Sequence, residues 1–154
     1  MWWPRKSVRQ RPEASPTSIN GLPLPRDLLA LIEAGRWRCP ADLSGVDRLF
    51  PYRGEFRLYT LDYMPFENRH WLVQRHPFFL GCPDPVKAPG DIDPMLSVLI
   101  GDLGVGYDRP IALDYRPSME DLVVLTLEWS DSAPDSRWVK VASNLREFAE
   151  LIGL

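Results

Sequence analysis

The stretch LIGDLGVGYDRPIALDYR, residues 99–116, decides the fold, because it joins two strand-like apolar runs through a glycine-rich loop. Glycines in such a loop predict backbone with a positive φ or a close approach, and Pro110 sets the entry to the second run. The loop also carries two aspartates, Asp102 and Asp108. Nothing between the two runs has the pattern of a helix, so they are expected to pair antiparallel rather than through a parallel crossover.

Further apolar runs extend this pair into a sheet. Four runs are expected to form strands, at residues 95–100, 111–114, 122–129 and 138–142. No gap between them resembles a helix, which favours an antiparallel meander. One side of the third run carries its apolar residues: Val123, Leu125, Leu127 and Trp129. Thr126 and Glu128 face the other way, which predicts a sheet with one covered face.

Two helices are expected outside the meander, one toward each end of the chain. The first begins at Pro25, a residue suited to a first helical turn, and ends at Gly35. The second is capped by Asn144, with Glu147 in the reach-back position of a capping box. Its apolar stripe would lie on the sheet and consists of Leu145, Phe148, Ala149 and Ile152. The sequence therefore predicts an α+β fold, mainly antiparallel sheet with N-terminal and C-terminal helices packed against it.

The middle of the chain is less regular. Residues 36–55 predict short helical turns and loop, with four apolar residues reaching the core: Leu43, Val46, Leu49 and Phe50. Residues 56–80 fit either strands or short helices. Four prolines and two glycines in residues 81–94 predict an extended surface loop.

Length and charge set the domain organisation and the class of partner. A chain of 154 residues predicts one domain, and its 16 prolines argue against long helices. Residues 1–22 carry a net charge of +3 and are expected to form a mobile basic arm, which leaves −6 for the domain at residues 23–154. An acidic domain argues against nucleic acid as a partner and suits a basic protein.

The location of the protein follows from apolar runs and cysteine usage. No run approaches the roughly 18 apolar residues of a membrane span, and no secretory signal is recognised, so the cytoplasm is expected. Cys39 and Cys82 are too few for a disulfide framework and are expected to be reduced, half-buried thiols.

Residues suited to catalysis or metal binding form no recognised motif. His70 and His76 lie in no catalytic pattern, and Asp91 and Asp93 lack the spacing of a calcium loop. The glycines of the 101–106 loop precede a strand, whereas a nucleotide-binding loop precedes a helix. We therefore expect no cofactor, no metal and no enzymatic activity.

One enzymatic alternative stays open. Asp102, Asp108 and Asp114 supply carboxylates of the kind that glycoside hydrolases use in pairs. In that case the chain would be a small hydrolase, with residues 81–94 as a lid over the acid pair.

Four pieces of the chain together resemble the SUKH superfamily, which includes fungal cell-wall-synthesis regulators and bacterial immunity proteins. They are LPLPRDLLALIEAG at residues 22–35, VLIGDLGVGYDRPIALDYR at 98–116, LVVLTLEW at 122–129 and RWVKVASNLREFAELIGL at 137–154. Their order and spacing agree with the family over about 130 residues, whereas residues 36–94 match no family pattern. The resemblance implies a non-enzymatic binding domain whose bacterial members neutralise toxins, usually encoded next door, by direct contact.

The partner surface is expected near the 101–110 loop and on the open side of the sheet. Tyr107, Tyr115 and Trp129 would provide rigid contact area. The aspartates of the same region would meet basic residues of the partner: Asp102, Asp108 and Asp114. A regulatory scaffold would use the same surface without neutralising a toxin, and the sequence leaves the oligomeric state open.

Overall fold

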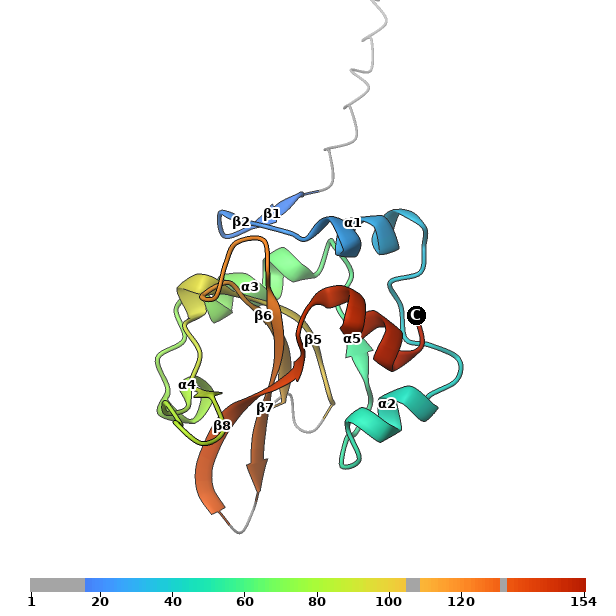
Figure 1. Ribbon diagram of the computed structural model, residues 1–154. Helices are drawn as coiled ribbons and strands as arrows, with labels where there is room; N and C mark the ends of the chain where they lie inside the picture. Colours follow the sequence, from blue (N-terminus) through green and yellow to red (C-terminus); the bar gives the residue numbers. More distant parts are fainter. Residues whose placement is uncertain (1–15, 105–108, 131–132) are drawn as a thin grey trace, which may run out of the picture.

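The computed structural model describes residues 16–104, 109–130 and 133–154, which form a single α+β domain (Figure 1). Its main sheet has the strand order β3-β5-β6-β7-β8-β4, and every neighbouring pair is antiparallel. The strands are β3 (Arg57–Leu58), β5 (Ser97–Asp102), β6 (Pro110–Asp114), β7 (Val123–Ser130), β8 (Ala133–Ala142) and β4 (Pro89–Gly90). The predicted four-stranded meander is confirmed as β5 to β8.

Helices cover both faces of this sheet. They are α1 (Arg26–Glu33), α2 (Ser44–Leu49), α3 (Met64–Trp71), α4 (Pro77–Leu80) and α5 (Leu145–Ile152), with a short 3-10 helix at Pro94–Leu96. Figure 1 shows α5 and α2 on one side of the sheet and α3 and α4 on the other. Every residue of β5 and β6 is buried, and successive side chains of a strand point to opposite faces. The expectation of one covered face is therefore wrong, because the middle of the chain covers the second one.

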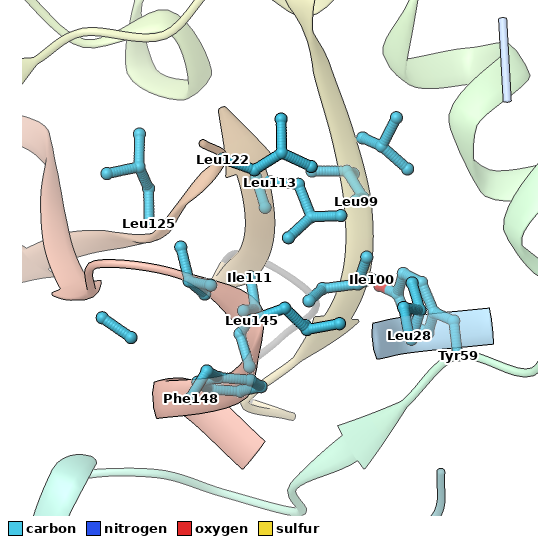
Figure 2. Packing of buried hydrophobic residues seen from close by; sticks show 14 of the residues in the cluster. Leu28, Tyr59, Leu99, Ile100, Ile111, Leu113, Leu122, Leu125, Leu145 and Phe148 are labelled. Atoms are coloured by element: carbon cyan, nitrogen blue, oxygen red, sulfur yellow. The ribbon is translucent and has the colours of Figure 1, made fainter. Parts of the chain in front are cut away.

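Helix α5 anchors the first face. Figure 2 shows Leu145 and Phe148 of this helix pointing toward Ile111 of β6, and all three side chains are buried. The predicted cap is confirmed: Asn144 Oδ1 accepts the Glu147 N–H at 2.8 Å. Glu147 reaches back to the N–H of Ser143, one residue before the cap. The expected helix and its apolar stripe are thus both present.

Two tryptophans anchor the second face. The rings of Trp71 on α3 and Trp138 on β8 lie 5.8 Å apart. Trp71 Nε1 donates to Ser97 Oγ at 2.9 Å, and Trp138 Nε1 donates to the Phe79 carbonyl at 2.7 Å. These bonds attach α3 to β5 and α4 to β8. Most of residues 56–80, for which the sequence allowed either strands or short helices, therefore form a helical layer on this face.

The N-terminal hairpin and first helix complete the core. β1 (Ser18–Ile19) pairs with β2 (Leu22–Pro23), and Ile19 is 2% exposed, so the predicted arm does not extend to residue 22. Helix α1 begins after Pro25, and Gly35 follows it with a φ of +67°, as predicted from the sequence.

The predicted surface loop at residues 81–94 contains a strand. β4 lies within it and pairs with β8, and a single bridge joins Gly81 to Asp91. A Cβ at Gly90 would lie 2.2 Å from the Cys82 carbonyl oxygen, so only glycine allows this close approach. The loop is therefore folded back on itself at the edge of the sheet.

Candidate functional site

Asp102 lies at the end of β5 with 1% of its surface exposed. Its Oδ2 is 2.8 Å from Arg57 Nη2, and the Tyr59 hydroxyl donates to the same oxygen at 2.9 Å. Its Oδ1 accepts the Gly104 N–H at 2.8 Å. Burial, and then the negative charge of Asp102, raise the pKa of Tyr59 well above its usual value. This carboxylate therefore joins β5 to β3 and shapes the start of the glycine loop.

Asp114 lies at the end of β6 and is 3% exposed. Arg116 binds it through Nε at 3.0 Å, and reaches Asp91 Oδ1 through Nη1 at 2.9 Å. Burial opposes the charge of Arg116, but the hydrogen bonds to both carboxylates outweigh it and raise its pKa. This network attaches the 81–94 loop to the sheet.

Tyr115 is also an interior residue. It is 3% exposed, and its hydroxyl donates to the Pro23 carbonyl at 2.7 Å, which ties the N-terminal hairpin to the end of β6. Burial raises the pKa of Tyr115. The expectation that Asp102, Asp114 and Tyr115 offer contact surface to a partner is wrong, because each is at most 3% exposed and its polar atoms are hydrogen-bonded within the domain.

The two described candidate acids are not brought together. In the β5–β6 register Asp102 pairs with Pro110 and Ser97 pairs with Asp114, so the two aspartates mark opposite ends of the strand pair. Four residue steps along β6, or about 13 Å, separate Asp114 from the partner of Asp102, whereas the catalytic carboxyl groups of glycosidases lie about 5–9.5 Å apart. Asp108 and Tyr107 lie outside the described residues.

Trp129 is the described candidate that keeps an exposed surface. It is partly buried on β7, where its ring lies 6.1 Å from that of Phe78. The Arg109 guanidinium lies 5.0 Å from the centre of the indole ring, and Arg109 Nη2 donates to the Trp129 carbonyl at 2.8 Å. The indole is therefore held between an aromatic ring and a cation.

A groove of about 1170 Å³ opens beside this indole. Trp129, Phe78 and Arg109 line it together with Tyr52 and His76. Tyr52 is 82% exposed. At the rim Arg137 pairs with Glu128, with the Nε and Oε2 atoms 3.3 Å apart. The groove thus combines aromatic side chains with charged groups at the end of the β7–β8 pair.

Phe78 and Tyr52 were not predicted from the sequence as members of this site. Their aromatic character was visible, but they lie about 50 and 75 residues before Trp129 in the chain. Phe78 reaches β8 because the Ser136 hydroxyl donates to its carbonyl oxygen. Only the folded chain brings these rings to the same groove.

The described residues hold no group of three His, Cys, Asp or Glu side chains placed to bind a metal ion. Cys39 and Cys82 are free and both exposed, so the expectation of half-buried thiols is wrong. Within the described part of the chain, no helix has the length and apolar character needed to cross a membrane.

Comparisons of the chain with models of protein families, with curated proteins and with solved structures returned no match. The resemblance to the SUKH superfamily therefore stays a prediction.

Proposed function

We propose that this chain is a non-enzymatic protein-binding domain of SUKH type that neutralises a cognate toxin by direct contact. The observation that carries the proposal is the groove around Trp129, where Phe78 and Arg109 hold the indole in place. A few residues contribute most of the binding energy in protein interfaces, and tryptophan, tyrosine and arginine are enriched among them. An anchor that is already ordered loses less conformational entropy when a partner binds.

The distribution of the family-like segments supports the proposal. Residues 98–116 contain β6 and all but the first residue of β5. Residues 122–129 contain most of β7, and residues 137–154 contain most of β8 together with α5. These segments thus form the four central strands of the sheet and helix α5. Residues 36–94, which match no family pattern, contribute Tyr52 and Phe78 to the groove. A groove built partly from such residues suits recognition of one particular partner.

The charge of the domain favours a basic toxin. Outside residues 1–22 the net charge is −6, and Asp135 and Glu128 line the groove beside the aromatic side chains. Acidic groups at the rim would speed association with a basic surface and orient it. Asp102 and Asp114 add little to this field, because each is buried and paired with an arginine.

Co-expression with the product of the neighbouring gene tests the proposal. The tagged domain should capture that protein stoichiometrically and lower its toxicity. Replacing Trp129 by Ala should weaken capture by at least about thirty-fold, since truncating an interface anchor costs about 2 kcal/mol or more. Tyr52→Ala, at an 82% exposed site, should weaken capture without affecting folding.

Phe66→Ala is the matched control. Phe66 is 53% exposed on α3 and lies outside the groove. Equal capture by all three variants would place the contact surface elsewhere. Capture without loss of toxicity would favour the regulatory scaffold, and no capture by a folded domain would contradict the proposal.

A further inference from the structure

A second hollow, of about 770 Å³, lies between α2 and the end of α5. It shares no residue with the groove around Trp129. Two of its lining residues, Gly45 and Leu151, lie in close backbone contact: a Cβ at Gly45 would lie 2.3 Å from the Leu151 carbonyl oxygen. Figure 1 shows α2 and α5 side by side, on the side of the sheet away from α4. This pocket is therefore built by the fold and is independent of the proposed toxin-binding groove.

Three arginines line this pocket: Arg36, Arg38 and Arg48. All three are exposed, and none forms an ion pair or side-chain hydrogen bond with a described residue. Other described arginines do pair with carboxylates, as Arg53 does with Asp47 and Arg116 with Asp114. The pocket therefore gathers guanidinium groups whose donors are available to a ligand.

Two acidic residues in the pocket restrict what can bind. Asp42 Oδ1 accepts the Ser44 N–H at 2.9 Å, and hydrogen bonds from Ser44, assisted by the positive charge of Arg48, lower the pKa of Asp42. Glu150 also lines the pocket. These carboxylates repel a long polyanion such as nucleic acid, as does the net charge of −6 on the domain. A ligand with only one or two carboxylates can contact the arginines without approaching Asp42 or Glu150.

The pocket also has an apolar side. Leu151 is 40% exposed there, and Pro40 lines the same hollow. Guanidinium groups bind carboxylates through two parallel hydrogen bonds, and an apolar residue beside them adds contact area. We propose that this pocket binds a short acidic peptide segment of a partner protein, in which one or two glutamate or aspartate side chains flank an apolar residue.

Nuclear magnetic resonance of the full chain, titrated with the peptide Gly-Glu-Leu-Glu-Gly blocked at both ends, tests this proposal. We expect saturable shifts at the amides of Arg38, Ala41 and Gly45, with a dissociation constant on the order of 1 mM. The shifts should shrink at high salt, which screens exposed charges. The matched peptide Gly-Gln-Leu-Gln-Gly should produce none.

Charge reversal provides the control within the chain. Arg38→Glu and Arg48→Glu should each abolish saturation, whereas Arg69→Glu, at an exposed arginine outside the pocket, should leave it unchanged. Equal shifts with the glutamine peptide, an equal loss in all three variants, or no shift at all would overturn the proposal. Stronger binding of a thymidine oligonucleotide at the same amides would also overturn it. Capture of a toxin through Trp129 should survive Arg38→Glu, which separates this pocket from the proposed function.

Discussion

At the residue scale, Asp102 illustrates why a candidate contact residue lies in the interior. Its carboxylate accepts hydrogen bonds from Arg57, the Tyr59 hydroxyl and the Gly104 amide. A buried carboxylate without such donors would lose several kcal/mol of hydration. The acidic residue next to the glycine loop was recognised from the sequence, but its donors at residues 57 and 59 were not. The position of Asp102 next to the glycine loop therefore marked it as a candidate, but did not show that it is a buried hydrogen-bond acceptor instead of a contact residue.

The burial of Tyr59 beside the negative charge of Asp102 predicts a pH dependence of stability. Folding raises the pKa of Tyr59 above the value of about 10 that it has in the unfolded chain. The stabilising contribution is therefore complete below pH 10 and is lost as the pH rises toward the folded pKa, because the unfolded chain releases this proton first. Stability of the wild type should fall by up to about 1.4 kcal/mol per pH unit above pH 10 from this group alone.

Urea unfolding of the wild type and Tyr59→Phe between pH 8 and pH 11 measures this effect. The variant should be less stable by about 2 kcal/mol at pH 8, where the bond to the carboxylate is lost. The difference in stability between the two proteins should narrow above pH 10. The wild type loses stability there as Tyr59 ionises in its unfolded chain, whereas phenylalanine has no proton to release. Parallel curves for the two proteins would show that Tyr59 titrates as in the unfolded chain.

At the element scale, Asn68 completes the edge of the main sheet. β3 has only two residues, and beyond it the Asn68 side chain binds both the N–H of Leu99, at 2.8 Å, and its carbonyl, at 2.9 Å. The register of β5 shifts at this point, between Leu99 and Gly101. A side-chain amide from α3 thus takes the place of a missing strand.

Replacing Asn68 by Ala should therefore destabilise the domain by about 2–4 kcal/mol, because the buried N–H and carbonyl of Leu99 would lose a partner each. Chemical denaturation measures the change, with Arg69→Ala on the same helix as the control. Arg69 is exposed, and its replacement should change stability by less than about 0.5 kcal/mol. Equal effects of the two substitutions would show that Asn68 does not support the strand.

Elements with a sustained apolar pattern or a helix cap could be predicted from the sequence. The meander and α5 have sustained periodicity, and α5 also has a cap at Asn144, so both were expected where they occur. Residues 56–80 divide into a two-residue strand and two short helices. Helix α3 is as long as α5, but it begins without a side-chain cap. Elements without such a local signal take their conformation from tertiary contacts, such as that of Trp71 with Ser97.

At the scale of the whole molecule, the sheet lies between two helical layers. β5 and β6 are buried on both faces, whereas β4 is a two-residue strand at the edge. Local unfolding of the central strands requires both helical layers to separate from the sheet, whereas local unfolding of β4 does not.

Hydrogen exchange should reflect this arrangement. The amides of β5 and β6 should exchange most slowly, with a free energy of opening close to that of global unfolding. The amide of Gly90 in β4, the outermost strand of the sheet, and those of α2, which packs mainly against α5, should exchange sooner. Faster exchange in β6 than in β4 would contradict a core centred on the middle strands.

The sequence by itself determined the fold class, the antiparallel meander and the helices toward the two ends of the chain. It also singled out candidate residues around the glycine loop. These depend on local features: alternation of apolar residues, glycine and proline positions, and a helix cap. Only the tertiary structure decided which candidates are exposed, that the second face of the sheet is covered, and that Phe78 and Arg109 hold Trp129. Burial and pairing depend on residues tens of positions apart, as between Arg57 and Asp102, and no local pattern encodes such contacts.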